Sequence, residues 1–298
     1  MWAITSYYNP EHYQSRLNNY KAFREKLNIP LLTIEHSFNG SFQLNPTDAD
    51  ILIQVSGGNI LWQKERLLNL AITKIPKDTE NIAWLDCDIF FENSDWYESA
   101  KLALEKANIV QLFSEVIYLK PNATSLNLED IHERWEGLIH KISSAGNKID
   151  WKIYSPGFAW AGKKKFLEEF GFYDAMIIGG GDSAMAFALY DQYELSKLHH
   201  QLNDMQYKHY LNWSIPFNKA IDKKINFVSG KIYHLWHGTL NNRQYFKRYD
   251  GLSKLEFNPF LDIKINEDGI WELRKEARDL KNYLIEYFKK RNEDEFLL

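Results

Sequence analysis

The sequence predicts an α/β fold in which a mostly parallel sheet is flanked by helices, with a helical extension near the C-terminal end. Two observations predict it. Short apolar runs alternate with segments of helical spacing along the first third of the chain. These runs are apolar at successive positions, which is typical of strands that are covered by helices on both faces. Strands that alternate with helices in this way form parallel sheets, and ligands bind at the carboxyl ends of such strands.

Prolines and glycines mark the ends of the first elements. Pro10 ends the first strand, Pro30 introduces the second, and Pro76 closes the second helix. The predicted strands are residues 2–8, 31–35, 50–55 and 82–85, and the helices between them are residues 12–27 and 61–72.

The later elements are less regular. The predicted helices are residues 96–106, 128–143, 163–170, 182–190 and 270–288, and the predicted strands are residues 110–113, 116–119, 225–228 and 231–235. No clear linker interrupts the chain, so we expect one domain over residues 1–240. Residues 241–298 are expected to extend it, with the amphipathic last helix packed on the domain or on a partner.

Composition and charge exclude several classes of protein. The chain has 298 residues, of which 45% are hydrophobic and 26% charged, as in a globular protein with a sizeable core. The net charge of -4 gives no basic footprint for a nucleic acid partner. The single cysteine, Cys87, excludes a disulfide framework and indicates the reducing cytoplasm. We expect neither a signal peptide nor a membrane span, because no apolar run approaches the roughly 20 residues that a span needs.

A basic run near the C-terminal end has two interpretations. Lys289, Lys290 and Arg291 could contact an anionic surface such as that of the inner membrane. Three acidic residues, 293–295, follow and offset this charge. We therefore favour packing of the last helix against the domain or a second subunit. The oligomeric state stays open.

Two carboxylates, Asp86 and Asp88, follow the apolar run 82–85 directly. Desolvating a charge is costly, so carboxylates at the tip of a buried strand need a partner. The usual partner of hard oxygen ligands is a divalent cation that also holds phosphate. The alternative is structural: the two aspartates cap a turn or pair with a lysine.

Two histidines, His234 and His237, lie at the end of the last predicted strand. A neutral imidazole can complete a metal site that is otherwise built from carboxylate, phosphate and water. Residues i and i+3 of a strand face opposite sides, so we expect one of the two as a metal ligand and favour His234. His237 precedes Gly238 and could instead contact phosphate or sugar; alternatively, either ring is an ordinary buried or surface histidine.

Asp182 follows three glycines and opens a predicted helix. The helix N-terminus stabilises a carboxylate, which suits either a plain cap or a general base that is held open to a cleft. Lys64 and Asn69 lie in the second predicted helix and could frame a nucleotide. Periodicity alone equally allows a solvated lysine and a packing asparagine.

Together these motifs resemble one family. The chain resembles nucleotide-sugar glycosyltransferases of the Rossmann-like GT-A fold, and within them the galactosyltransferase and N-acetylgalactosaminyltransferase group. The resemblance covers roughly residues 1–240. It is carried by Lys64…Leu68-Asn69, Asp86-Cys87-Asp88, the block Gly157-Phe158-Ala159-Trp160-Ala161-Gly162, the segments Phe170-Gly171-Phe172-Tyr173-Asp174 and Gly179-Gly180-Gly181-Asp182, and Tyr233-His234.

The resemblance implies a metal-dependent, inverting hexosyltransferase in glycan or surface polysaccharide synthesis. Its donor would be a nucleoside diphosphate sugar, with UDP favoured over GDP, and its acceptor a hydroxyl of a carbohydrate or glycolipid. Mn²⁺ or Mg²⁺ would bind Asp88 and a late histidine, with Asp86 as a further ligand or a ribose contact. The implied roles of the remaining residues are general base for Asp182, sugar stacking for Trp160, and donor contacts for Lys64, Asn69, Gly157, Gly180 and Gly181.

One departure from the family pattern concerns the acceptor. The group commonly carries a Glu-Asp pair where this chain has Gly181-Asp182, and that glutamate often helps to bind the acceptor. The base position is retained in Asp182, whereas the identity of the acceptor cannot be carried over.

Two other functions compete with this prediction. A nucleotidyltransferase that acts on sugar phosphates also uses a parallel sheet and a divalent ion, but it needs a phosphate loop near the first strand, and residues 1–15 contain no glycine. The other alternative is an inactive module that binds nucleotide sugars. The intact set Asp86, Asp88, Asp182 and His234 argues against such decay.

Overall fold

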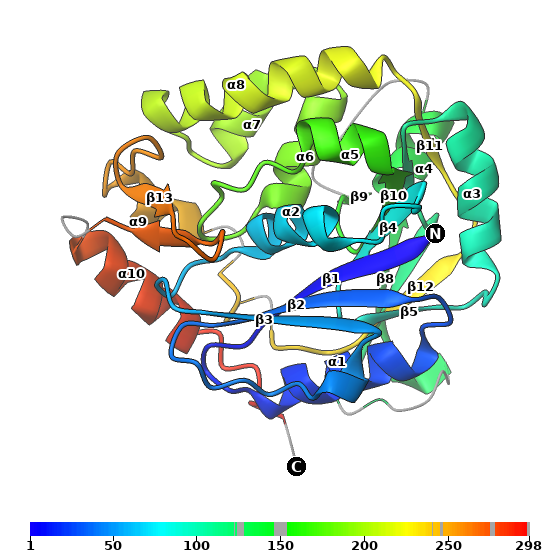
Figure 1. The fold of residues 1–298 in the computed structure, drawn as a ribbon, viewed down its shortest axis with the longest axis horizontal. Coiled ribbons are helices and arrows are strands. Elements are labelled where there is room, and N and C mark those ends of the chain that lie inside the picture. Colours follow the sequence, from blue (N-terminus) through cyan, green and yellow to red (C-terminus); the bar gives the residue numbers. More distant parts are fainter. Residues whose placement is uncertain are drawn as a thin grey trace.

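The computed structural model of the chain describes residues 1–121, 123, 128–145, 154–239, 241–244, 247–274 and 278–296. Within them, a seven-stranded sheet forms the centre of the molecule, and helices cover both of its faces (Figure 1). The strand order is β11-β6-β10-β4-β1-β2-β3, and only β10 runs antiparallel to its neighbours. The predicted fold class, a mostly parallel α/β sheet flanked by helices, is confirmed. The strands are β1 (Trp2–Tyr8), β2 (Leu31–Ser37), β3 (Ile51–Ser56), β4 (Asn81–Leu85), β6 (Ile109–Gln111), β10 (Ala159–Lys163) and β11 (Ile225–Phe227).

The central sheet separates two hydrophobic cores, because successive side chains of a strand point to opposite faces. In β1, Ile4 joins the core that contains Leu67 of α2, whereas Ala3 joins the core that contains Phe23 of α1. All seven residues of β2 are buried, as expected for a strand that is covered on both sides. Figure 1 shows α1 and α2 on opposite sides of the sheet. The helices of this part are α1 (Gln14–Lys26), α2 (Lys64–Lys74) and α3 (Trp96–Lys106), with a 3-10 turn at Pro46–Asp48.

A second sheet brings the late part of the chain to the end of β4. Its order among the described residues is β5-β12-β7-β8-β9. β5 begins directly after the Asp86–Asp88 turn, and β12 pairs with it so that His234 stands opposite Ile89. The pairing therefore delivers a residue from late in the sequence to the aspartate turn. The strands are β5 (Ile89–Phe91), β7 (Glu115–Leu119), β8 (Ile131–Gly137), β9 (Tyr154–Ser155) and β12 (Lys231–His234).

The helix predicted over residues 128–143 is wrong in its first half. A 3-10 turn (Leu128–Asp130) leads into β8, and only α4 (Leu138–Ser144) is helical. β8 pairs antiparallel with β7, with Trp135 opposite Val116. This cross-strand pairing outweighs the local helical spacing, because strand formation depends on the neighbour that a strand finds.

The middle of the chain differs from the prediction in two further ways. Residues 159–163, for which no element is predicted, form the strand β10. Two helices, α7 (Tyr193–His199) and α8 (Asp204–Ile221), lie where no element is predicted. Asn203 is the N-cap of α8, and this helix continues past Pro216. The helices α5 (Lys164–Phe170) and α6 (Gly181–Leu189) agree with the prediction to within two residues at each end.

The C-terminal part packs on the central domain. The predicted helix 270–288 is shorter in the structure: β14 (Trp271–Leu273) pairs with β13 (Ile263–Ile265), and α10 spans Arg278–Lys289. Leu284 of α10 is fully buried in the same core as Ile4. α9 (Arg248–Ser253) packs against α10. The boundary at residue 240 remains a prediction.

The segment after α10 closes onto the N-terminal helix. Asp294 accepts hydrogen bonds from the backbone N–H groups of Gln14 and Ser15 at the start of α1, at 2.8 and 2.9 Å. Glu293 is buried between Arg16 and Arg291. Among the described helices, none combines the length and apolarity that crossing a bilayer requires.

Candidate active site

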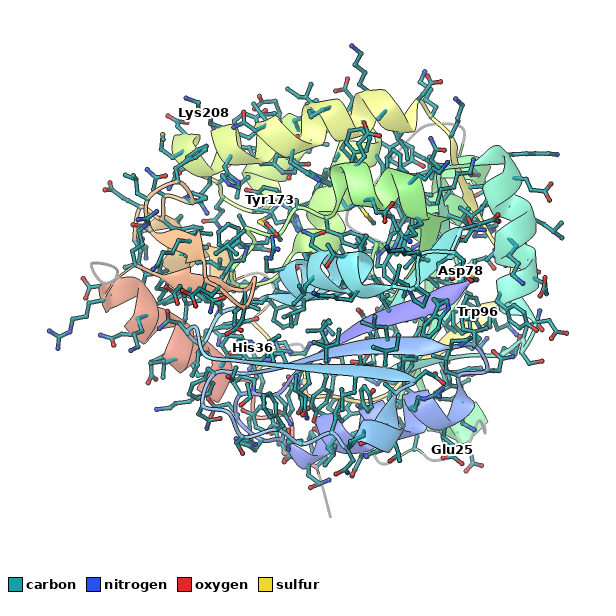
Figure 2. The ribbon with its side chains drawn as sticks, viewed as in Figure 1. Glu25, His36, Asp78, Trp96, Tyr173 and Lys208 are labelled. Carbon is teal, nitrogen blue, oxygen red and sulfur yellow. The ribbon has the colours of Figure 1, made fainter. Side chains whose placement is uncertain are left out.

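The predicted site residues gather at the edge of the sheet where the parallel strands end. Tyr8 and His36 are paired at the ends of β1 and β2. Figure 2 shows His36 at this edge and Asp78, which precedes β4, at the opposite edge. Asp86 and Asp88 follow β4, so they lie at the edge where ligands bind in such folds.

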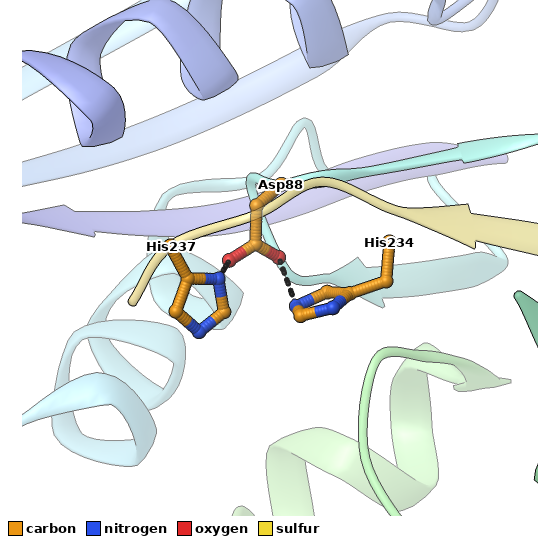
Figure 3. A group of neighbouring side chains, drawn as sticks. All are labelled: Asp88, His234 and His237. Carbon is orange, nitrogen blue, oxygen red and sulfur yellow. Dashed lines mark ion pairs between the residues drawn. The ribbon is translucent and has the colours of Figure 1, made fainter. Parts of the chain in front are cut away.

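Asp88 lies between the two late histidines (Figure 3). Its Oδ2 is 2.8 Å from His237 Nδ1, and its Oδ1 is 3.8 Å from His234 Nε2. One ligand atom from each side chain lies within 4.8 Å of the others. The expectation that the two rings face opposite sides is wrong, because β12 ends at His234 and the following residues leave the strand direction.

These three side chains fit a divalent cation. Asp88 Oδ1 and His234 Nε2 are buried, and the described residues offer neither of them a hydrogen-bond partner, while His237 Nδ1 faces only Asp88 Oδ2, at 2.8 Å. A buried polar atom without a partner costs about 1–3 kcal/mol, and a cation between these side chains would remove that cost. One carboxylate and two imidazoles are donors that Mn²⁺ and other divalent metals accept.

The protonation states agree with this fit. Burial lowers the pKa of His234 and of His237, so each ring is neutral and has a lone pair to offer. Burial alone would raise the pKa of Asp88, but His237 and His234 hold it well below its usual range. Asp88 is therefore a carboxylate rather than a carboxylic acid in this cluster.

Asp86 belongs to a different cluster, which is built around Lys64. Lys64 Nζ lies 2.5 Å from Asp86 Oδ1 and 2.8 Å from Asp182 Oδ2. It also donates to Asp182 Oδ1 at 3.1 Å. The metal-ligand group found among the described residues contains Asp88 but not Asp86. Asp86 thus has the lysine partner that the structural alternative foresees, and it bridges through Lys64 to the predicted base.

Charges in the Lys64 cluster are not balanced, since three acids surround one ammonium. Burial raises the pKa of Glu65 to about 8 and that of Asp86 to about 7, while Lys64 opposes both shifts. Burial by itself would lower the pKa of Lys64, but Asp182 and Asp86 raise it well above its usual value. Lys64 is therefore a fixed cation, and part of the acid around it is protonated near neutral pH.

Three glycines leave the space that Asp182 and its neighbours occupy. A Cβ on Gly157 would lie 3.1 Å from Asp182 Oδ2. A Cβ on Gly180, whose φ is +110°, would collide with the Tyr249 hydroxyl, and one on Gly181 with the Glu65 carboxyl. The glycines thus allow α6 to begin close to α2.

Two predicted site residues do not reach the site. Trp160 is completely buried in β10, with its ring stacked over Trp84 and its Nε1 donating to the Pro156 carbonyl. No face of this ring is available to a sugar, and we do not carry its predicted role forward. Asn69 exchanges hydrogen bonds with the backbone of Phe172 and donates to Asp174, so it fastens a loop rather than a nucleotide.

Sequence reasoning missed three residues at this edge. Glu65 follows Lys64 on α2 and is buried beside Gly181. Arg243 is partly buried where its charge lowers the pKa of both late histidines, and desolvation lowers its own pKa to about 10. Glu35, buried at the end of β2, accepts from the Gln43 N–H at 2.6 Å. No spacing in the sequence marks these three, because their neighbours are distant along the chain.

A polar hollow lies at the ends of β1 and β2. Its lining includes Tyr7, Asn9, Glu35, His36 and Gln43. Tyr7 also packs near Cys87, which separates the two aspartates. The hollow therefore opens beside the aspartate turn.

Comparison with known proteins gives distant likenesses only. No protein-family model matches the chain, and no curated protein matches it. Among solved structures, it is similar to 4-diphosphocytidyl-2C-methyl-D-erythritol synthase from Anaerococcus prevotii, with 12% identity and a TM-score of 0.31 over 77% of this chain and 86% of that one. It is also similar to S. aureus TarS, with 12% identity and a TM-score of 0.39 over 97% of this chain. The chain spans about half the length of TarS, covering 52% of it. Likenesses this weak carry no argument about function.

Proposed function

We propose that this protein is a metal-dependent glycosyltransferase of the GT-A kind. It transfers a hexose from a nucleoside diphosphate sugar, with UDP favoured, to an acceptor hydroxyl, and it inverts the anomeric configuration. The observation that carries the proposal is the convergence of Asp88, His234 and His237 at the strand edge, with ligand atoms that lack other partners. The Lys64 cluster beside it supplies a separate carboxylate for proton transfer.

Asp88, His234 and His237 would hold Mn²⁺ or Mg²⁺. A divalent cation bound there supplies charge neutralisation for the leaving diphosphate. Arg243, partly buried near the same histidines, adds a positive charge that suits phosphate oxygens.

Asp182 would act as the general base. Its side chain is 29% exposed, so the carboxylate stays open to an acceptor while Lys64 fixes its orientation. As the acceptor oxygen forms its bond to the anomeric carbon, the bond from that carbon to the diphosphate breaks and the hydroxyl proton passes to Asp182. Asp86 would hold Lys64, and thereby Asp182, in place.

The proposal is tested with common UDP-, GDP- and TDP-sugars, each with Mn²⁺ and with EDTA. We expect one donor to raise the melting temperature and to be hydrolysed slowly, in both cases only with metal. A ligand at 100 times its Kd stabilises by about 2.7 kcal/mol, which a thermal melt resolves. Release of pyrophosphate from a nucleoside triphosphate and a sugar phosphate would indicate a nucleotidyltransferase instead. Donor binding without any turnover would indicate an inactive binding module.

The natural acceptor we propose is a carbohydrate or glycolipid, and the place of action is the cytoplasm, including its membrane surface. The lone cysteine, Cys87, and the net charge of -4 support this environment and do not support a nucleic acid partner.

A further inference from the structure

The stretch of chain that carries His237 lies outside the regular elements. β12 ends at His234, and the N–H of Leu235 still donates to the Asp88 carbonyl at 2.8 Å. Beyond that point, neither His237 nor Gly238 makes a backbone–backbone hydrogen bond with any residue that the structure describes. A metal ligand needs a fixed orientation, so other contacts must hold His237 beside Asp88.

The C-terminal segment, residues 290–296, packs against this stretch. A Cβ on Gly238, whose φ is +98°, would lie 3.3 Å from the Arg291 carbonyl oxygen and 3.4 Å from Glu293 Cγ. A side chain there would press on the segment, whereas a glycine lets the two backbones lie close together. The residue that follows His237 therefore lies directly against the C-terminal segment.

The residue that precedes His237 is held in the same way. The Trp236 ring meets the Phe296 ring edge-on, with the ring centroids 5.8 Å apart. Asn19 of α1 donates to the Trp236 carbonyl at 2.8 Å. The stretch that carries His237 is therefore held between α1 and the C-terminal segment.

Glu293 fastens the C-terminal segment to the domain. The residue is 1% exposed, and its carboxyl oxygens lie 2.5 Å from Arg16 Nε and 2.6 Å from Arg291 Nε. Burial alone would raise the pKa of Glu293, but Arg16 and Arg291 lower it to about 2. The ionised carboxylate thus stays with its two cations, because a buried charge without a partner is costly. Since Arg16 belongs to α1, Glu293 joins the segment to that helix.

We propose that Glu293 is a positioning residue for the metal ligand His237. Through its two ion pairs it holds the C-terminal segment against Gly238, and thereby keeps His237 Nδ1 at 2.8 Å from Asp88 Oδ2. Groups that orient a metal ligand contribute about 10–100-fold to metal affinity. The coupling is reciprocal, so a bound metal strengthens the docking of the segment by the same factor. This inference rests on the metal site of the proposed function, and it depends on neither the donor nor the acceptor.

The first test measures Mn²⁺ affinity from the free-ion signal in electron paramagnetic resonance, at a temperature where circular dichroism shows each variant folded. We expect Glu293→Gln to weaken Mn²⁺ binding by about tenfold or more, because an amide does not replace a carboxylate between two arginines. Phe296→Ala keeps the buried ion pairs and removes only the contact with Trp236. It should weaken binding by a smaller factor, and it carries the test if Glu293→Gln does not fold.

Asp50→Asn is the matched control. Asp50 also pairs with an arginine, Arg24, and accepts from a backbone N–H, that of Leu31 at 2.8 Å. It lies where β2 and β3 begin, at the edge of the sheet opposite to the metal site. The variant should lower the free energy of unfolding but leave the Mn²⁺ affinity within about twofold of the wild type, because distant sites act independently.

The second test uses the wild-type chain. Hydrogen exchange of the backbone amides of residues 290–296 is followed with and without Mn²⁺. We expect Mn²⁺ to slow exchange there more than in α3, whose amides report any general stabilisation. In Asp88→Asn, which lacks a metal ligand, Mn²⁺ should no longer slow exchange in the segment.

The outcomes separate this inference from the proposed function. If the wild type binds Mn²⁺ but Glu293→Gln and Phe296→Ala bind it within about twofold as well, the role of Glu293 is overturned while the metal site stands. An equal loss in Asp50→Asn, or equal slowing of exchange in α3 and in the C-terminal segment, also overturns it. If the wild type binds no Mn²⁺, the metal site of the proposed function fails and the inference fails with it.

Discussion

Asp86 and Asp88 stand two residues apart in one turn, yet they belong to different clusters. Asp88 lies between two buried histidines, and its pKa is held well below its usual range against the effect of burial. Asp86 pairs with Lys64, and burial raises its pKa to about 7. The aspartate at position 88 is thus an ionised candidate metal ligand. The aspartate at position 86 belongs to a cluster of carboxyl groups that shares protons near neutral pH.

This difference shows that the chemical role of each aspartate depends on the side chains it contacts and not on the Asp-x-Asp motif that contains both. An Asp-x-Asp sequence offers two carboxylates, but alternate residues of an extended segment share a face only when the segment stays straight. Here the turn after β4 sends Asp88 toward the end of β12 and Asp86 toward the start of α2. In the proposed function, Asp88 would therefore bind the metal and Asp86 would hold the lysine of the base, on either side of Cys87.

The largest effect on turnover is expected from Asp182→Asn. The amide keeps the shape but cannot accept the proton, so transfer should fall by about 10²–10⁴-fold while the donor Kd stays within a few-fold. Single-turnover transfer and donor thermal shift measure the two quantities. A transfer rate near that of the wild type would mean that Asp182 is not the general base. The separation of a metal-binding cluster from a base-carrying cluster would then be wrong.

The next effect concerns stability. Lys64→Met leaves Asp86 and Asp182 without their shared cation, and we expect a loss of about 1–3 kcal/mol in the free energy of unfolding, measured by urea denaturation. The Mn²⁺ affinity should change much less, because Lys64 is not in the Asp88 cluster. If Lys64→Met weakened Mn²⁺ binding by a free energy as large as its loss in the free energy of unfolding, the two clusters would form one site.

The smallest effect is a pH dependence. The pKa of Glu65 is raised from 4.5 to about 8, so the native state keeps a proton that the unfolded state has released. The free energy of unfolding should therefore fall as pH rises from 7 to 8, by at most about 1.4 kcal/mol per pH unit from this group. Glu65→Gln should flatten that part of the slope in thermal melts at pH 7, 7.5 and 8. An unchanged slope would place the proton elsewhere, Asp86 being the nearest candidate.

The sequence predicted the fold class and most strands of the central sheet. Successive apolar residues in the first strands predict burial on both faces, and β2 is indeed completely buried. The end of β4 marks the ligand edge through Asp86 and Asp88. The structure then places both His234 and His237 beside Asp88, whereas the strand spacing predicts only one of them there.

The features that the sequence did not predict depend on contacts between segments that are distant along the chain. Helical spacing misled at residues 131–137, because β8 is held by its partner β7. Trp160 was taken for an exposed ring, but β10 inserts between β4 and β6 and buries it. Glu65 carries no motif, and its position becomes meaningful only through Gly181, more than a hundred residues away in the chain.

The measurement that tests the central claim most directly is a Mn²⁺ titration followed by electron paramagnetic resonance, in which bound Mn²⁺ disappears from the free-ion signal. The titration is run on the wild type, Asp88→Asn and Asp86→Asn, each with and without UDP. We expect the wild type to bind one Mn²⁺, more tightly with UDP, Asp88→Asn to lose at least 100-fold in affinity, and Asp86→Asn to lose less than fivefold. Equal losses in the two variants, or no binding by the wild type, would contradict the assignment of the metal to Asp88, His234 and His237.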